Sequence, residues 1–464
     1  MTDTSKDSAD ESNWPLVKSE RTWGRIELGI VLLVAASATW CYIIGEYVGY
    51  YLNLKQGFAT MTAGAMIGML LVTLAVVPAA TRYGIDSIVA ARPQFGSRGW
   101  IITVFLQYAS IIGWNSLLLI FFGKSVVQLL LTTGLVGEGA TDVILPVATL
   151  VACAVVYGVL LTGKSGIERA SNILFFFIVG VGLWMVYLLL TQNGAAVAEA
   201  KPAYASGDIQ WDYVTGIEIG IVSLLSWWPY IGAMVRVAPN ASTASMPAML
   251  GMGLPVPLLS LIGLAAILAL ETSDPSAWMV QLGGTFYGAI ALVFVIAANL
   301  GTAIIGVYAT AVGLKSVPGI GKLSWKVTLL LALVPVALIG VVVPDLFFNN
   351  FGTFLAFIGV FFAPLCGIQI VDYLILRKQR LSVRGLYDGS STAPYYYWGG
   401  FNPAALLAMA AGFVTYVYLL DPLTYVSKTP YEVLTASLPS AVIGGLVFWV
   451  LTLVLVKPAQ KGGY

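Results

Sequence analysis

The feature that most constrains this chain is a succession of long apolar segments. A helix that crosses the hydrocarbon core of a bilayer needs roughly 20 mainly apolar residues, and the sequence offers about twelve such segments. Because unpaired backbone groups are costly in lipid, each is expected to be helical. The eighth is long for one crossing, so it is predicted to be tilted or interrupted. The predicted spans are 27–52, 57–80, 100–123, 143–163, 170–191, 214–236, 247–270, 283–314, 325–344, 348–373, 402–420 and 433–456.

Composition also predicts an all-α integral membrane protein. Of 464 residues, 59% are hydrophobic and 10% are charged, whereas a soluble domain is about a quarter charged. The chain has no histidine, which excludes histidine-ligated metals and Ser-His triads. Cys41, Cys153 and Cys366 lie far apart inside apolar segments and are expected to be small buried side chains.

Lysine and arginine gather in alternate loops. Most of the 23 basic residues fall on one side, which the positive-inside rule assigns to the cytoplasm. Both termini are therefore predicted to be cytoplasmic, in a multi-pass protein of the cell (plasma or inner) membrane. The predicted polar segments are an N-terminal tail at 1–25, a loop at 377–401 and a C-terminal tail at 457–464.

Two short stretches resemble each other although five predicted helices separate them. TWCYIIGE begins at Thr39 in the first span, and WWPYIG begins at Trp227 in the sixth. These spans cross in opposite directions, which is typical of the inverted repeats of secondary transporters. We predict a first repeat at 26–191, a second at 214–376, and two further helices at 402–456.

The sixth span is predicted to be broken. Pro229 removes a backbone donor there, and Gly232 follows one turn later. In lipid, a broken helix is tolerated where it is buried or lines a cavity, and its freed carbonyls can hold a cation while a half-helix faces a polar ligand. A proline kink that only shapes packing is the alternative.

Aromatic and amide side chains near mid-span are candidates for ligand binding. Trp114 and Trp227 offer faces that can stack on a planar ligand. Asn115 carries an amide that must be satisfied at this depth, and it could read the N–H and C=O groups of a heterocycle. Core packing is the alternative for each of these side chains.

Two kinds of polar group point to ion coupling. Glu46, a carboxylate inside the first span, is a candidate for a proton, cation or substrate contact, and Glu218 has a similar position in the sixth. Asn299 and Thr302 lie about one turn apart in the eighth span, where their oxygens suit Na⁺. The alternatives are acids near the surface and a helix interface of small residues.

Two longer motifs resemble a known family. RYGIDSIVAARPQFGSRGW occupies 82–100, and APLCGIQIVDYLILRKQRLSVRGLYD occupies 363–388, followed by YYYWGGFNPAA. Over roughly residues 22–455 the chain looks like the nucleobase:cation symporter-1 family, which includes cytosine, hydantoin and allantoin permeases. The resemblance implies a twelve-helix protein whose first ten helices form a 5+5 inverted repeat (LeuT-like), and import of a nucleobase or related N-heterocycle with Na⁺ or H⁺.

The resemblance also implies where the site lies, with the substrate between helices one, three, six and eight, and a cation between helices one and eight. This sequence departs from the family's pattern at one point: the positions of the family's usual stacking aromatics align nearer Ser110 or Ile111 and Leu224. The expected substrate-binding residues are Ser37, Trp40, Glu46, Trp114, Asn115, Ser223, Ser226, Trp227 and Asn299, and the expected Na⁺ ligands are Ala36, Asn299 and Thr302.

We therefore expect a secondary active transporter that works by alternating access. An enzyme is not expected, because the sequence contains no evident nucleophile–base pair or metal cluster. No organic cofactor, nucleic acid or obligate protein partner is expected; the partners are a small heterocyclic substrate, Na⁺ or H⁺ as coupling ion, and the lipid bilayer. A transporter of amino acids or organic cations on the same repeat fold is the alternative, followed by a channel.

Overall fold

The computed structural model describes residues 14–162 and 167–464, and all regular structure in these ranges is helical apart from isolated β-bridges. Residues 1–13 of the predicted N-terminal tail lie outside the described residues. In the first half of the chain the helices are η2 (Lys18–Glu20), α2 (Arg25–Ala36), α3 (Trp40–Gly49), α4 (Leu54–Tyr83), α5 (Ser87–Phe95), α6 (Ile101–Thr132), η3 (Glu138–Ala140), α7 (Thr141–Thr162) and α8 (Ile167–Glu199).

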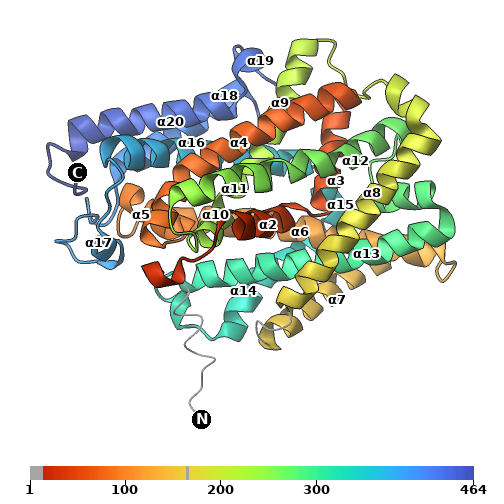
Figure 1. Cartoon of the computed structure of the whole chain (residues 1–464), viewed down its shortest axis with the longest axis horizontal. Helices are drawn as coiled ribbons and strands as arrows, with labels where there is room; N and C mark the ends of the chain where they lie inside the picture. The colour runs from red at the N-terminus through yellow and green to blue at the C-terminus, as the bar shows by residue number, and fades with distance from the viewer. Residues whose placement is uncertain (1–13, 163–166) are drawn as a thin grey trace.

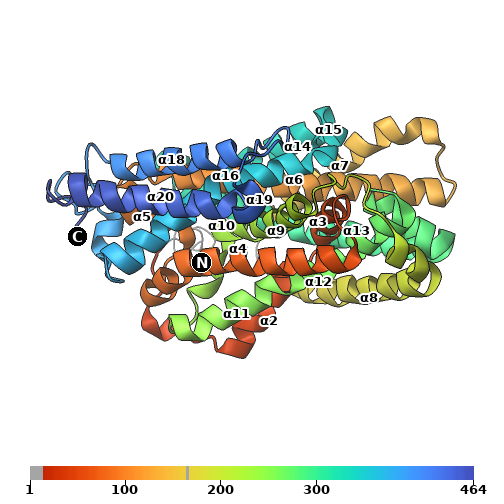
Figure 2. The same cartoon turned by 90° about the horizontal axis from the view of Figure 1, so that it is seen from above.

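The second half continues with helices of the same kind. They are α9 (Ile209–Leu225), α10 (Trp228–Val235), α11 (Ala241–Gly253), α12 (Pro255–Leu270), α13 (Pro275–Lys315), η5 (Ile320–Lys322), α14 (Trp325–Val342), α15 (Pro344–Asn349), α16 (Phe351–Ile370), η6 (Val371–Leu376), α17 (Val383–Tyr387), α18 (Pro403–Leu419), α19 (Tyr431–Leu434), α20 (Ser437–Leu451) and η7 (Thr452–Val456). Most of the long helices, among them α4, α13 and α20, run along the longest axis of the molecule, whereas α8 is inclined to it in Figure 1, and α5 and the last residue lie at the left end in both views (Figures 1 and 2).

The number of membrane crossings can be compared with the predicted spans. Within the described residues, nine helical stretches are long and apolar enough to cross a membrane. Two more crossings are bent pairs: α2 and α3 meet at 64°, and α9 and α10 at 48°. Helix α18 is apolar but shorter. The prediction of a multi-pass helical protein is confirmed, whereas the number of about twelve spans stays a prediction.

A short break separates the two helices of each bent pair, and the break in the sixth span lies before Pro229, the residue expected to cause it. Helix α2 ends at Ala36 and α3 begins at Trp40, whereas α9 ends at Leu225 and α10 begins at Trp228. Pro229 therefore lies in the first turn of α10, where no intrahelical partner for its missing N–H is needed. The prediction that Pro229 itself opens the sixth span is wrong in position, because the proline starts the second half-helix.

The glycines of the repeated sequence stretches serve close packing. A β-carbon on Gly45 would lie 1.8 Å from the carbonyl oxygen of Ser260 on α12, and one on Gly232 would lie 2.2 Å from the backbone nitrogen of Ser87 on α5. The N–H of Gly232 also donates to Ser87 Oγ at 3.0 Å. Each half-helix is thereby held against a neighbouring helix.

The eighth predicted span is interrupted, as expected from its length. Helix α13 has a non-helical residue at Gly284, where φ is 64°, a conformation that glycine adopts without a steric penalty. The segment before Gly284 is short and the segment after it is the long crossing. The break therefore lies at the beginning of the predicted span at 283–314.

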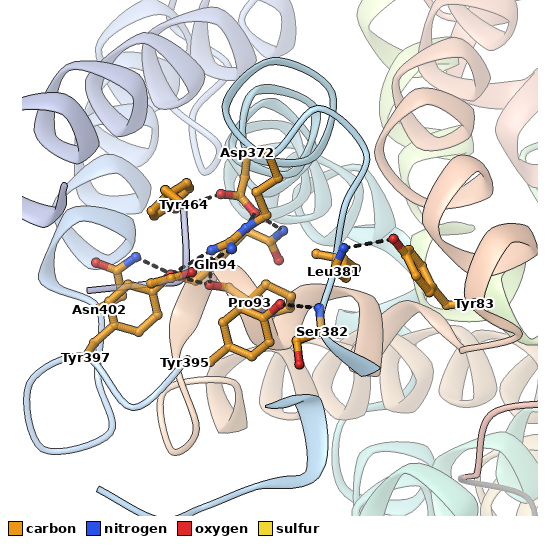
Figure 3. A network of polar contacts seen from close by, with 12 residues as sticks. Tyr83, Pro93, Gln94, Asp372, Leu381, Ser382, Tyr395, Tyr397, Asn402 and Tyr464 are labelled. Atoms are coloured by element: carbon orange, nitrogen blue, oxygen red, sulfur yellow. Dashed lines mark hydrogen bonds and ion pairs between the residues drawn. The ribbon is translucent and has the colours of Figure 1, made fainter. Parts of the chain in front are cut away.

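A polar network joins the two family-like motifs at the end of the molecule where the last residue lies (Figure 3). Asp372 pairs with Arg377 at 2.7 Å, with both side chains buried. The same carboxylate accepts a hydrogen bond from Gln94 Nε2 at 2.7 Å and another from the hydroxyl of Tyr464 at 2.7 Å. Arg377 also donates to the carbonyl of Pro93 at 3.2 Å. These motifs therefore fix the connection between α4 and α6 against the end of α16.

Candidate functional site

A cavity of about 440 Å³ lies where the two bent spans break. It is bounded by α2 and α3, by α10 and the break before it, by α5 and α6, and by α13. The residues around it are Val34, Ala35, Ser37, Trp40, Asp86, Ile88, Gln107, Trp114, Asn115, Leu118, Ser226, Trp227, Pro229, Tyr230, Ala233, Met234, Arg236, Ala298, Gly301, Thr302, Ile305, Gly306, Tyr308, Ala309, Val312, Gly313 and Ser316.

Three tryptophans from three different spans meet at one end of the cavity. The ring of Trp40 lies 5.0 Å from that of Trp114, edge to face, and 6.2 Å from that of Trp227, measured between centroids. The indole nitrogen of Trp227 is buried and has no hydrogen-bond partner among the described residues. A buried donor without a partner is costly.

Asn115 is a second polar residue beside the tryptophans, and it borders the cavity. It is 2% exposed, and its amide packs so closely on α13 that a β-carbon on Gly306 would lie 2.4 Å from Asn115 Oδ1. The hydrogen bonds of the described residues include none to this amide. An amide offers both a donor and an acceptor, so it can pair with adjacent N–H and C=O groups of a ligand.

The hydroxyl groups that border the cavity are already bonded within their own helices. Ser37 Oγ donates to the carbonyl of Leu33 at 2.7 Å, and Thr302 Oγ1 to that of Ala298 at 3.0 Å. Ser226 Oγ donates to the carbonyl of Ser223. Their oxygens keep the capacity to accept a further hydrogen bond or to contact a cation.

The structure thus brings together seven of the residues predicted from the sequence: Ser37, Trp40, Trp114, Asn115, Ser226, Trp227 and Thr302 all border the cavity. Ser223 does not, because its hydroxyl points back to the carbonyl of Ile219 at 2.6 Å. Ala36 is buried behind the cavity, where its carbonyl accepts a contact from Cys41 Sγ at 3.6 Å. The substrate contact of Ser223 and the Na⁺ contact of Ala36 remain predictions.

Both carboxylates considered from the sequence lie outside the cavity. Glu46 is 2% exposed, and its Oε1 accepts a hydrogen bond from the indole nitrogen of Trp278 at 2.7 Å. Glu218 accepts from the backbone nitrogens of Ala436 and Ser437 at 3.2 and 3.1 Å, which caps the start of α20. At this position the Glu218 carboxylate stabilises the N-terminus of α20, which is a structural role.

Asn299 lies next to the break of the first span. Its Oδ1 accepts a hydrogen bond from Thr39 Oγ1, while its Nδ2 is buried without a partner among the described residues. Thr39 belongs to the break between α2 and α3, so this bond joins the break to α13. Among the described residues, no group of three or more His, Cys, Asp or Glu side chains is arranged to hold a metal ion.

Sequence reasoning missed the polar residues in the other half of the cavity. Gln107, Tyr230 and Tyr308 border it. Gln107 precedes Asn115 by eight residues on α6, a spacing that places both on a similar face of a helix. That spacing, together with the rarity of amides inside an apolar span, was a signal in the sequence that could have identified Gln107.

The two ends of the cavity differ. Around the tryptophan end, Phe351 and Phe354 of α16 cover Trp114, with ring centroids 5.2 and 5.9 Å away. At the other end the cavity reaches Asp86, Arg236 and Ser316, which lie in or next to the connections that follow α4, α10 and α13. The cavity therefore leads from a closed aromatic end to the loops at the end of the molecule that carries α5.

Many apolar crossings, with two of them broken around a shared cavity, define a multi-pass membrane transporter. The chain belongs to the family of permeases for cytosine/purines, uracil, thiamine and allantoin, whose model matches residues 15–444. It is accordingly a permease and not an enzyme.

Individual relatives and solved structures agree with this assignment. The purine-uracil permease NCS1 of Arabidopsis thaliana is 24% identical over 94% of this chain and 76% of its own length, and the hydantoin permease of Microbacterium maritypicum is 24% identical over 87% and 84%. The inward-facing conformation of Mhp1 is similar with a TM-score of 0.80 at 20% identity, covering 97% of this chain and 94% of Mhp1.

Two further solved structures show how general the fold is. Mhp1 in a closed conformation with bromovinylhydantoin gives a TM-score of 0.76 at 21% identity, covering 96% of each chain. A Na⁺-coupled sialic acid symporter gives 0.61 at 12% identity, covering 96% of this chain and 92% of the symporter. The expected LeuT-like fold is confirmed, while the repeat boundaries at 26–191 and 214–376 stay predictions.

Proposed function

We propose that this permease imports a nucleobase or a related N-heterocycle by symport with Na⁺ or H⁺. The observation that carries the proposal is the combination of Trp40, Trp114 and Trp227 with two polar groups that make no hydrogen bond among the described residues, the buried Trp227 indole N–H and the Asn115 amide beside it at the cavity. A planar ring gains contact area from the indole faces. Its C=O and N–H groups satisfy the donor and acceptor that the protein leaves open.

The chemistry of these groups limits the substrate further. The Trp227 N–H donates only, so it requires an acceptor such as a ring carbonyl. The Asn115 amide pairs with a neighbouring N–H and C=O, as a lactam or imide ring presents them. Charged residues border the cavity only at the loop end, as Asp86 and Arg236. The tryptophan end therefore suits a neutral heterocycle better than an amino acid or an organic cation, the alternative substrates.

The shape of the cavity supports an inward-facing state of an alternating-access cycle. Its open end lies beside the loops that the positive-inside rule assigns to the cytoplasm, and on this assignment both chain ends are cytoplasmic in the cell membrane. The opposite end is covered by Phe351 and Phe354. Import requires a second state in which these aromatics move away and the loop end closes.

For the coupling ion we propose Na⁺, bound between the break of the first span and α13. Ala36 precedes that break, and Asn299 and Thr302 carry side-chain oxygens on α13, which are suitable ligands for a hard cation. The bond from Thr39 to Asn299 would open when a cation takes the Asn299 oxygen. Ion binding would then change the conformation of the break beside the substrate, and the coupling must be reciprocal.

Proton coupling through Glu46 is the alternative. This carboxylate is buried in the first broken span and bonded to Trp278 in the short segment of α13 before Gly284, so its protonation would alter a contact between the first span and that segment. Its distance from the cavity argues for an indirect effect on substrate binding.

The test is uptake by proteoliposomes of labelled cytosine, uracil, hypoxanthine, allantoin and hydantoin, with separate Na⁺ and pH gradients. We expect concentrative uptake of at least one compound under an inward Na⁺ gradient, and its loss when an ionophore collapses that gradient. Uptake driven only by a proton gradient would transfer the coupling to H⁺. Absence of uptake of every compound, with the protein folded and correctly inserted, would refute the proposed substrate class.

A further inference from the structure

The cavity is longer than one heterocycle and its second half has no assigned role. Along α6 it is bordered by both Asn115 and Gln107, which are eight residues apart and therefore separated by about 12 Å along the helix axis. Along α13 it continues from Thr302 to Ser316, or about 21 Å.

Gln107 is buried but poorly satisfied. Its side chain is 7% exposed, and its Nε2 donates to the carbonyl of Pro229 over 3.4 Å, which is long for a hydrogen bond. The hydrogen bonds of the described residues include none to its Oε1. One acceptor and a weakly engaged donor thus border the cavity between its two ends.

Gln107 repeats the arrangement of Asn115 two turns away. A β-carbon on Gly306 would lie 2.4 Å from Asn115 Oδ1, and one on Gly313 would lie 2.4 Å from Gln107 Oε1. Each amide of α6 therefore rests on a glycine of α13, and each of these four residues borders the cavity. The two glycines are seven residues apart, so the two pairs follow the same helix interface.

Aromatic rings also continue into the second half. Tyr230 borders the cavity, and its ring centroid lies 5.5 Å from that of Trp227. Tyr308 borders it from α13, between Gly306 and Gly313. The region around Gln107 thus offers an amide and aromatic faces, the same two features that distinguish the tryptophan end.

We propose that Gln107, with Gly313 and Tyr230, forms a second substrate station between the central site and the open end of the cavity. The Gln107 amide pairs there with the N–H and C=O edge of a neutral heterocycle as it leaves or enters. The inference rests on the proposed function, because it takes the same substrate class. A station of this kind lowers the barrier for release without contributing to affinity at the tryptophans.

The test compares three variants in proteoliposomes with the compound of the panel that the wild type transports best. Gln107→Met keeps the volume and removes both hydrogen-bonding groups. Gly313→Ala pushes the Gln107 amide from its resting position. The matched control is Ser125→Ala, which removes a buried, unpartnered hydroxyl from the same helix α6 away from the cavity.

We expect Gln107→Met to lower transport Vmax/KM about five- to tenfold, the effect of losing one to two hydrogen bonds. Equilibrium binding of the same compound should stay within twofold of wild type. Gly313→Ala should act in the same direction, and Ser125→Ala should leave both quantities unchanged.

Two results would overturn the inference. Unchanged Vmax/KM in Gln107→Met would remove Gln107 from the route, and a fall in binding affinity equal to that in transport would make it part of the central site or of the fold. Failure of the proposed function is distinguishable, because the wild type itself would then transport no compound of the panel.

Discussion

The rings of Trp40 and Trp114 lie edge to face with centroids 5.0 Å apart. Trp40 is the first residue after the break in the first span, and Trp114 lies in the middle of α6. An aromatic contact of this kind contributes about 0.5–1.5 kcal/mol beyond its buried area. This contact joins the half-helix α3 to the wall of the cavity. A ligand that separates the two rings or stacks between them therefore also acts on the broken first span.

Replacing Trp227 with phenylalanine should separate stacking from hydrogen bonding. Trp227→Phe keeps an aromatic face but removes the unsatisfied indole N–H, and one hydrogen bond to a ligand carbonyl is worth about fivefold to tenfold in affinity. We expect that loss in equilibrium binding, and a larger one for Trp227→Ala. The control Trp184→Phe alters a tryptophan on α8 that packs on Tyr287 and should bind normally. Unchanged affinity in Trp227→Ala would remove Trp227 from the site.

Thr302→Ala tests the proposed ion site. The hydroxyl of Thr302 bonds to the carbonyl of Ala298 within its own helix, so its removal should leave the fold intact. We expect the Na⁺ concentration for half-maximal uptake to rise about tenfold, as for loss of one ligand worth about 1.4 kcal/mol. Thr310→Ala is a matched control, because Thr310 makes the same kind of intrahelical bond, to the carbonyl of Gly306, and does not itself border the cavity. Equal Na⁺ dependence in the two variants would place the ion elsewhere.

Glu46→Gln distinguishes the two coupling ions. Glutamine retains an oxygen that can accept the hydrogen bond from Trp278 but cannot carry a proton. On the Na⁺ model we expect Na⁺-driven uptake to keep at least about half of the wild-type rate. Loss of uptake driven by a pH gradient, with binding preserved, would instead identify Glu46 as the proton carrier.

Lys124→Met should favour opening of the aromatic end. The Lys124 ammonium lies 3.3 Å from Asp274 and 3.2 Å from Asp345, so it links α6 to α13 and to α15, which precedes α16. Partly exposed ion pairs contribute up to about 1 kcal/mol each, and their loss should shift the population of open states several-fold. A Leu118→Cys reporter should then react faster with an impermeant maleimide.

This labelling experiment has a low background and a direct control. The three native cysteines, Cys41, Cys153 and Cys366, are buried. Lys428→Met removes a basic residue whose ammonium lies over the ring of Tyr418, with no role in the link between α6 and α15, and it should leave the labelling rate unchanged. Equal rates in the Lys124 and Lys428 variants would show that the ion pairs do not hold the aromatic end closed.

Local sequence patterns predicted the class of fold because the bilayer imposes long apolar helices, and seven of the residues that they singled out border one cavity. Trp114, Asn115 and Trp227 stood out because aromatic and amide groups are unusual at mid-span. The break of the sixth span was misplaced, since a proline is tolerated in the first turn of a helix and so marks its start. Whether a proline breaks a helix or starts one depends on which neighbouring residues leave the helical conformation. The composition of the segment does not determine that position.

Tertiary contacts explain the remaining differences. Glu46 is predicted to be functional because an acid inside an apolar span is costly; the structure adds a hydrogen bond from Trp278, which lies 232 residues away, and the role of Glu46 stays a prediction. Gln107 gave only a weak signal, since its importance depends on Gly313 of α13 and on the course of the cavity. Such relationships arise from packing between distant spans, which sequence periodicity does not reveal.

The central claim is that a neutral heterocycle binds between the tryptophans and the Asn115 amide and is moved by an ion gradient. The most direct measurement is concentrative uptake of the panel by wild type and by Asn115→Leu in parallel proteoliposomes, with equal amounts of inserted protein. We expect the wild type to accumulate one compound until an ionophore collapses the gradient, and Asn115→Leu to lose at least about tenfold in Vmax/KM. Equal accumulation by both proteins, or wild-type uptake that only equilibrates, would contradict it.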